Sequence, residues 1–135
     1  MSAIVYNRAK NNITITDLRI MLLVGYTPDP DHATLDDLTA FEATFTNYAR
    51  KALAGEAFTV INATDRGMLD ADDTGLTWAS AGGAVNNLVS HAVIFEYVDA
   101  DDTNNLPVSC HTVGLTTNGG DLVVTIHADG ILYTT

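Results

Sequence analysis

The sequence predicts an α+β fold that is mainly β, an antiparallel β-sandwich or barrel with one amphipathic helix. Fourteen of the seventeen acidic residues are Asp and three are Glu, and Asp favours turns and caps whereas Glu favours helix interiors. Short segments that alternate apolar and polar residues, the period of a half-buried strand, recur along the chain. Residues typical of turns separate these segments, as expected for strands joined by short loops.

We expect a single domain over residues 1–135, with an extended N-terminal arm at residues 1–11. A chain of 135 residues can bury a hydrophobic core without staples. Hydrophobic residues make up 47% of the sequence and charged residues 17%, which is typical of a globular chain. Cys110 is the single cysteine, so we expect no disulfide within the chain and predict a small buried apolar group here.

The predicted helix covers residues 34–54. Thr34 can act as its N-cap, and Asp37 three residues later completes a pair like a capping box. Acidic residues lie early and Arg50 and Lys51 lie late in this segment, which matches the helix dipole. The apolar residues recur at helical spacing and form one stripe: Leu35, Leu38, Phe41, Phe45, Tyr48, Ala49 and Leu53.

Strands are predicted on both sides of this helix. The strongest candidate is LVSHAVIFEYV at residues 88–98, in which apolar residues occupy both faces. The links between strands contain Asn and Gly, which favour tight turns. The complete set of predicted strands is residues 12–16, 18–24, 57–61, 75–80, 88–98, 106–115, 121–127 and 131–133.

The charge of the chain is strongly negative and unevenly distributed. The net charge is -11, all six Lys and Arg residues lie at or before position 66, and nine of the acidic residues follow it. Such a surface repels phosphate backbones and anionic lipids, so we predict no direct contact with nucleic acid and none with a membrane.

Two acidic stretches read almost alike, LDADDTGL at residues 69–76 and VDADDTNNL at residues 98–106. Neither is an EF-hand loop, because counting from Asp70 or from Asp99 places no Glu at the twelfth position. Several carboxylates in one turn can attract a hard cation, so a weak calcium site is one interpretation. The other, which we favour, is that both stretches are solvated acidic turns. The candidate calcium ligands are Asp70, Asp72, Asp73, Asp99, Asp101 and Asp102.

No catalytic constellation is recognised, and we predict that the protein is not an enzyme and binds no cofactor. The motifs of serine hydrolases and phosphate-binding loops are missing. The histidines lie in different segments without the close spacing of zinc sites, so His91 is expected on an inward face and His127 on the surface. Trp78 and Tyr97 could line a sugar site, but a lone Trp after a strand is more often part of the core.

The order of these segments resembles a family of small virion proteins of tailed bacteriophages, encoded in the head-gene module. The resemblance covers the chain from about Ile20 to the C-terminus, and LPVSCHTVGL departs from it where a more apolar strand is expected. It is carried by MLLVGYTPDPDH, DDLTAFE, TNYARKAL, LDADDTGLTW, HAVIFEYV, LPVSCH and GDLVVTIHADGILYTT.

The resemblance implies a structural role, most directly a capsid decoration (cement) protein that binds and stabilises the head shell. The implied partners are the major capsid protein and further copies of this chain, with a trimer suited to three-fold positions of an icosahedral shell. The protein would be made in the cytoplasm of the host bacterium and end on the capsid surface. Arg8 and Lys10 in the N-terminal arm are the predicted contacts with the shell.

Three other functions stay open at this stage. A head–tail connector or tail structural protein is the closest neighbour of the decoration role. A carbohydrate-binding, lectin-like module would instead use Trp78, Tyr97 and the acidic loops, with or without calcium. A glycosidase-like enzyme ranks third, because its carboxylate pair can be recognised only in three dimensions.

Overall fold

A five-stranded antiparallel sheet forms the centre of the protein. The computed structural model describes residues 3–5, 17–53, 57–61, 66–70, 76–124 and 132–134, with side chains described at 17–53 and 76–124. The strand order of the central sheet is β1-β8-β7-β2-β3. Its strands are β1 (Ala3–Val5), β8 (Leu106–Thr116), β7 (Leu88–Glu96), β2 (Leu18–Val24) and β3 (Lys51–Ala52).

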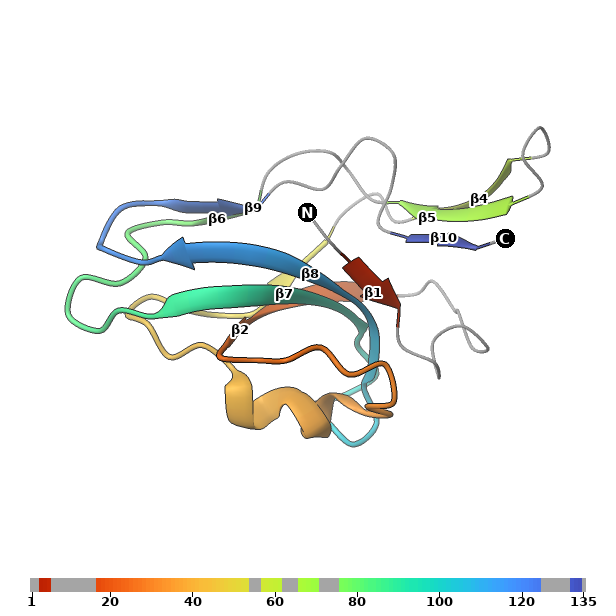
Figure 1. Cartoon of the computed structure of the whole chain (residues 1–135), viewed down its shortest axis with the longest axis horizontal. Helices are drawn as coiled ribbons and strands as arrows, with labels where there is room; N and C mark the ends of the chain where they lie inside the picture. The colour runs from red at the N-terminus through yellow and green to blue at the C-terminus, as the bar shows by residue number, and fades with distance from the viewer. Residues whose placement is uncertain are drawn as a thin grey trace.

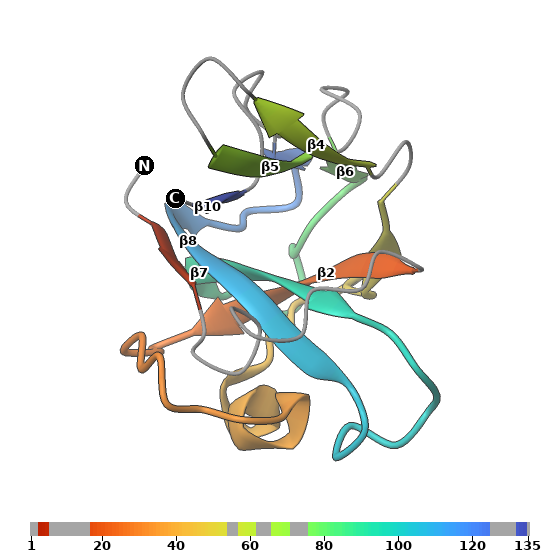
Figure 2. The ribbon, with the colours of Figure 1, turned by 90° about the vertical axis from the view of Figure 1, so that its right-hand side faces the viewer.

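Two smaller antiparallel sheets lie on one side of the central sheet, and the helix η1 (Leu35–Phe41) lies on the other (Figures 1 and 2). One small sheet contains β10 (Leu132–Thr134), β5 (Arg66–Asp70) and β4 (Ala57–Ile61), and the other contains β6 (Leu76–Trp78) and β9 (Leu122–Val124). This layered arrangement confirms the predicted fold class, mainly β with antiparallel sheets and one helix. The described strands do not close into a barrel.

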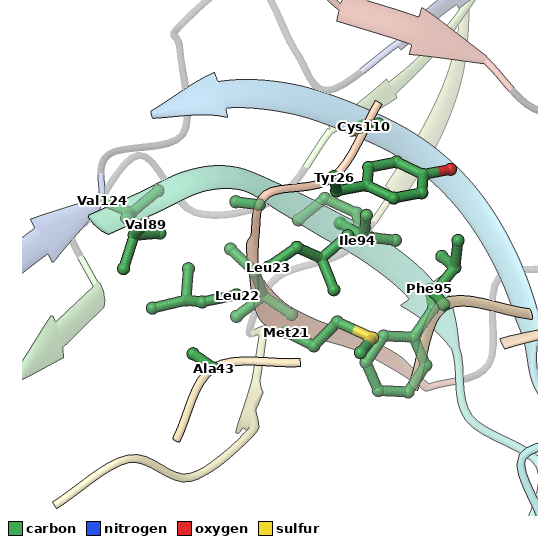
Figure 3. Close-up of a cluster of buried hydrophobic side chains, with 14 of the residues drawn as sticks. Met21, Leu22, Leu23, Tyr26, Ala43, Val89, Ile94, Phe95, Cys110 and Val124 are labelled. Carbon is green, nitrogen blue, oxygen red and sulfur yellow. The ribbon is translucent and has the colours of Figure 1, made fainter. Parts of the chain in front are cut away.

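The core is centred on β2, which is buried on both faces. β2 pairs with β7 along its full length, from Leu18 opposite Glu96 to Val24 opposite Val89. The four residues from Ile20 to Leu23 are almost completely buried, because η1 covers one face and the β6–β9 side covers the other. Side chains from several elements meet around this strand (Figure 3). Cys110 is among them, as predicted.

A bulge interrupts the pairing of β7 with β8. Leu115 lies opposite Val89, but the next residues that pair are Thr112 and His91, so β8 carries one residue more than β7 at this point. Gly114 lies in this bulge with a φ of 69°, a conformation that glycine adopts without the steric cost of a side chain. The segment LPVSCHTVGL, for which the resemblance led us to expect a more apolar sequence, therefore forms a strand, β8, that carries a bulge near its C-terminal end.

The helix prediction is correct at its start and wrong in its extent. η1 is a 3₁₀ helix that ends at Phe41, whereas residues 34–54 were predicted to be α-helical. At its start, the Asp37 carboxylate accepts the backbone N–H groups of Ala33 at 3.0 Å and Thr34 at 3.2 Å, as the capping pair predicted. Several residues of the predicted stripe are nevertheless buried: Leu35, Leu38, Phe45 and Leu53.

After η1 the backbone bonds to distant segments instead of continuing the helix. The N–H of Ala43 donates to the carbonyl of Leu22 at 2.9 Å, and the N–H of Thr46 donates to the carbonyl of Val85 at 3.1 Å. Asn47 has a φ of 70°, which a helix interior does not accommodate. Hydrogen bonds between segments therefore replace the helical ladder, while the apolar side chains still reach the core.

Most predicted strands are present, and three short strands were not predicted. The segments at 18–24 and 57–61 are strands, and those near 75–80, 88–98 and 106–115 are strands with shifted ends. β1, β3 and β5 were not predicted, and β3 lies inside the expected helix. Residues 12–16 and 125–127, also predicted as strand, lie outside the described residues.

Candidate functional site

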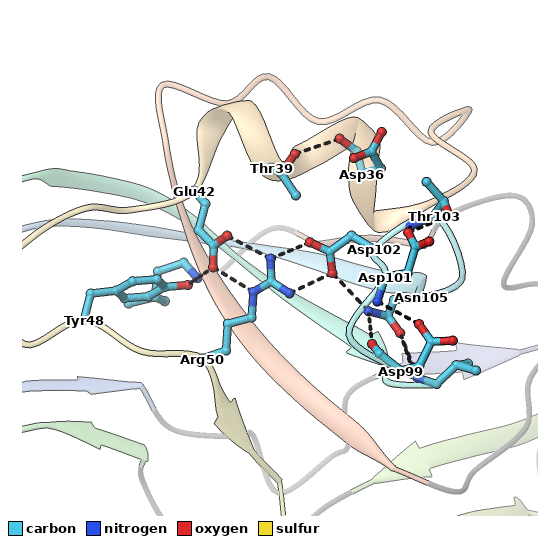
Figure 4. Close-up of polar contacts among 12 residues, drawn as sticks. Asp36, Thr39, Glu42, Tyr48, Arg50, Asp99, Asp101, Asp102, Thr103 and Asn105 are labelled. Atoms are coloured by element: carbon cyan, nitrogen blue, oxygen red, sulfur yellow. Dashed lines mark hydrogen bonds and ion pairs between the residues drawn. The ribbon is translucent and has the colours of Figure 1, made fainter.

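The guanidinium of Arg50 joins three segments of the chain through two bidentate ion pairs (Figure 4). Its Nε donates to Glu42 Oε1 at 2.7 Å and its Nη2 to Glu42 Oε2 at 2.8 Å. On the other side, Nη1 donates to Asp102 Oδ1 at 2.8 Å and Nη2 to Asp102 Oδ2 at 2.9 Å. The three side chains are only 18–26% exposed. Bidentate geometry and limited exposure make this the strongest polar tether among the described residues.

Tyr48 extends this tether into the central sheet. Its hydroxyl donates to Glu42 Oε1 at 2.8 Å and accepts the backbone N–H of Leu22 at 3.2 Å. Burial, followed by the nearby Glu42 carboxylate, raises the pKa of Tyr48 well above its usual value, so the hydroxyl keeps its proton. The hydrogen bonds that Arg50 donates to Asp102 and then to Glu42 likewise raise the pKa of Arg50, which stays charged. The phenol and the guanidinium therefore both keep their protons at neutral pH, which preserves the hydrogen bonds of this network.

Asn105 continues the tether into the second acidic stretch. Its amide nitrogen donates to Asp102 Oδ1 at 3.0 Å and to the carbonyl of Asp99 at 3.1 Å, and its oxygen accepts the N–H of Val98 at 2.7 Å. Asn105 is almost completely buried. Its backbone carbonyl accepts the N–H of Leu35 at 3.0 Å. The acidic loop is thus attached to η1 and to the end of β7.

The carboxylates of the second acidic stretch are used within the loop. Asp99 Oδ1 accepts the N–H of Asp101 at 2.7 Å, and Asp101 Oδ1 accepts the N–H of Thr103 at 3.0 Å and its hydroxyl at 2.7 Å. Hydrogen bonds from Thr103 lower the pKa of Asp101, and those from Arg50 lower the pKa of Asp102. The stretch is a hydrogen-bonded acidic turn held by an ion pair.

Of the six candidate calcium ligands, the structure describes the side chains of Asp99, Asp101 and Asp102. Among residues with described side chains, no group of three or more His, Cys, Asp or Glu is placed to hold a metal ion. Asp102 is paired with Arg50 instead. Asp70 ends β5, but its side chain is not described, and Asp72 and Asp73 lie outside the described residues. A calcium site at the first acidic stretch stays a prediction.

A smaller cluster around Tyr26 was missed at the sequence level. The Tyr26 hydroxyl lies 2.8 Å from His32 Nδ1, and His32 Nε2 lies 3.9 Å from Asp29 Oδ2. The Tyr26 ring packs edge-on against Phe41 and His91, with centroids 5.3 and 5.9 Å away. The two prolines in YTPDPDH indicated a turn, but not that its Tyr and His would close it. The cluster fastens this turn against the sheet.

The remaining histidines of the described residues are engaged within strands. Ser109 and His111 lie on β8 with Oγ and Nε2 2.9 Å apart, and Ser109 is fully buried. Burial lowers the pKa of His111 and of His91, which favours the neutral ring in both. A serine without access to solvent has no path to a substrate, so this pair is not a nucleophile site in the described conformation. His127 lies outside the described residues.

Trp78, one of the two aromatic residues considered for a sugar site, belongs to the core. Its side chain is 1% exposed and its indole N–H donates to the carbonyl of Ala49 at 2.7 Å. The Lys51 ammonium lies 5.5 Å from the ring centroid. Tyr97 is half-buried, and the Arg19 guanidinium lies 3.5 Å from its ring centroid. The core interpretation of Trp78 is confirmed, so it offers no ring face for stacking on a sugar.

No family model, curated protein or solved structure matches this chain. The fold and its contacts are therefore the basis for any functional assignment. None of the described helical residues forms a segment with the length and apolar character needed to cross a bilayer. The predicted shell contacts Arg8 and Lys10 lie outside the described residues, although β1 just before them is paired with β8.

Proposed function

We propose that the protein is a structural component of a bacteriophage virion, a capsid decoration (cement) protein that binds and stabilises the head shell. The observation that carries this proposal is that side chains suited to binding a ligand make their contacts within the chain. Asp102 is ion-paired with Arg50, and Trp78 is buried with its N–H bonded to Ala49. Groups that an enzyme or a lectin would present to a ligand here hold the chain together, which supports a protein that assembles. The resemblance to small virion proteins supports the same role.

The Arg50 tether suits this role because a cement protein must keep its shape under load. Glu42 follows η1, Arg50 precedes β3, and Asp102 lies in the loop between β7 and β8. One side chain therefore restrains three connections at once. A rigid surface loses little conformational freedom when it binds, so more of the contact energy is available for holding neighbouring shell subunits.

The proposed partners are the major capsid protein and other copies of this chain. A trimer matches the three-fold positions of an icosahedral shell, and three linked copies bind with an avidity that a single copy lacks. In this proposal Arg8 and Lys10 contact the shell. Pairing of β1 with Ser109, Cys110 and His111 of β8 fixes the chain shortly before these two cations.

The first test is the copy number of the protein in purified virions of the phage that encodes it. Quantitative mass spectrometry would compare it with the major capsid protein. We expect a number comparable to the capsid subunit, as shell decoration requires. A handful of copies per particle would indicate a connector or tail component instead, and complete absence from virions would contradict a virion role.

The second test concerns the shell contact. Deletion of residues 1–10 would also remove β1 from the central sheet, so substitution is the cleaner experiment. We expect Arg8→Ala together with Lys10→Ala to weaken binding to shells assembled without the protein by at least about tenfold, because each loss is multiplied over the linked copies. Arg19→Ala is the matched control, since Arg19 is already paired with Asp17. Equal binding by the double variant and the wild type would exclude this contact.

A further inference from the structure

In the part of the chain that the structure describes, three segments without charged side chains lie at one end of the central sheet. β7 begins and β8 ends there, and the loops that flank these strand ends complete it (Figure 1). We call this surface the neutral end and define it as residues 44–47, 81–88 and 114–120. These three segments contain no Asp, Glu, Lys or Arg, although the chain has 23 such residues in total, 17 acidic and six basic. Asp121 follows directly and marks its border.

Large apolar side chains are exposed at this end. Val85 is 48% exposed, Leu88 58% and Leu115 46%, and Val123 on the adjoining β9 is 50% exposed. Only one further large apolar side chain in the described part of the chain is comparably exposed. That residue is Val98, 60% exposed, which lies beyond the far end of β7 and next to Asp99. Exposed apolar side chains that concentrate where charge is missing are typical of contact surfaces.

Hydrogen bonds hold the segments of the neutral end together. The N–H of Val85 donates to Thr46 Oγ1 at 2.9 Å, and the N–H of Asn87 donates to Thr117 Oγ1 at 2.9 Å. The backbone of Thr117 returns a bond from its N–H to the carbonyl of Asn87 at 2.9 Å. These bonds hold the three segments to one another, so little order has to be imposed on them when a partner binds.

We propose that the neutral end is the surface through which copies of this chain associate with one another. Two copies that each carry a net charge of -11 repel wherever acidic surfaces meet. At the neutral end this repulsion is weakest, and burial of the exposed apolar side chains favours contact. A second copy matches this surface because it presents the same uncharged, apolar end. In a symmetric ring, the neutral ends converge on the rotation axis and the acidic surfaces face outward.

The test is the oligomeric state of the full chain in solution, measured by sedimentation velocity and by light scattering over a wide range of concentrations. We expect a concentration-dependent oligomer that strengthens as salt is added, because salt screens the repulsion between acidic copies. Leu88→Glu and, separately, Val85→Glu are expected to weaken association at least about tenfold by placing like charges opposite each other. Both side chains are exposed, so circular dichroism should show an unchanged fold.

Val98→Glu is the matched control, because it adds the same charge at an exposed apolar position outside the neutral end. It should leave association unchanged. A monomer at every concentration and salt would overturn the proposal, as would an oligomer that dissociates with added salt or that resists Leu88→Glu. The experiment contains no capsid, so its failure is distinct from failure of the decoration role.

Discussion

At the scale of single residues, Arg50 illustrates what a sequence pattern can and cannot predict. Its position late in an apolar stripe indicated a favourable contact with a helix C-terminus. In the structure it instead pairs with Asp102, which lies 52 residues further along the chain, and with Glu42. The sequence identified Asp102 as one of several equivalent acids in a turn. Nothing local distinguishes it from Asp101, because the partner that selects it is brought near only by folding.

Replacement of Arg50 should therefore destabilise the protein strongly. Arg50→Ala leaves the Glu42 and Asp102 carboxylates partly buried and without the cation that lies between them. We expect a loss of about 2–4 kcal/mol in the free energy of unfolding, near the lower part of the range for broken buried pairs because some solvent reaches the group. Urea unfolding followed by circular dichroism measures this. Arg50→Lys keeps the charge but not the bidentate geometry and should fall between alanine and wild type.

Arg19→Ala is the control for Arg50→Ala. Arg19 also pairs with a carboxylate, Asp17, but the guanidinium and its partner are more exposed. Arg19→Ala should therefore lower the free energy of unfolding much less than Arg50→Ala does, since exposed ion pairs are screened by water. Equal losses for Arg19→Ala and Arg50→Ala would mean that the tether contributes no more than an ordinary surface pair.

The same tether makes stability depend on pH in the acidic range. Hydrogen bonds from Arg50 hold the pKa of Asp102 below its ordinary value of 3.8. A depressed folded-state pKa contributes stability that is complete above the unfolded value and is lost as pH falls through the folded value. We expect the free energy of unfolding to decrease below about pH 4, and less steeply in Arg50→Met, where the largest cause of the low pKa of Asp102 is gone. Carbon NMR of the Asp102 carboxyl group would locate its titration, and an ordinary pKa there would refute the argument.

At the scale of elements, strands were more predictable than the helix. β2 and β7 follow from apolar runs whose local preference and burial agree. Several side chains of the apolar stripe that predicted the helix are indeed buried. The backbone of Thr46 nevertheless forms hydrogen bonds with the 81–87 loop instead of bonds within a helix. β5, with the sequence RGMLD, has little strand character by itself and is formed by pairing with β4 and β10. In both the predicted helix and β5, the observed structure depends on pairing with distant segments, which the periodicity of the sequence does not reveal.

Close packing of loops at the neutral end predicts a position-specific glycine requirement. A Cβ added at Gly82 would overlap Asn86 Oδ1 and lie 2.7 Å from Thr117 Oγ1, in a residue with a φ of 87°. Gly82→Ala should therefore combine backbone strain with overpacking and lower the free energy of unfolding by about 3 kcal/mol. Denaturant unfolding of the purified variant gives this value directly.

Gly83→Ala separates the effect of backbone strain from the effect of overpacking. Gly83 also has a positive φ, 97°, but the nearest atom to an added Cβ is 3.8 Å away, which is ordinary contact. Only the backbone strain remains, so a loss of about 1 kcal/mol is expected. If both alanine variants lose the same amount, strain alone explains the requirement and the packing of Asn86 and Thr117 against Gly82 is not limiting.

At the scale of the whole molecule, Trp78 lies where different parts of the fold meet. It belongs to β6, which pairs with β9, and its indole N–H reaches the carbonyl of Ala49 just before the Arg50 tether. Lys51 of the central sheet lies over its ring. The side chain thus reports on contact between the central sheet and the small β6–β9 sheet. It is the single tryptophan of the chain, so its fluorescence is assigned without ambiguity.

The native protein should accordingly show blue-shifted Trp78 emission that acrylamide quenches poorly, because the side chain is 1% exposed. If the two sheets form one cooperative unit, the urea transition followed by fluorescence should coincide with that followed by circular dichroism. Arg50→Ala should move both curves together to lower urea, since the tether and the tryptophan belong to the same core. A fluorescence transition that precedes the loss of secondary structure would instead mean that the β6–β9 sheet detaches first. Efficient quenching in the native state would contradict the buried position of Trp78 and restore the sugar-stacking role that its burial argues against.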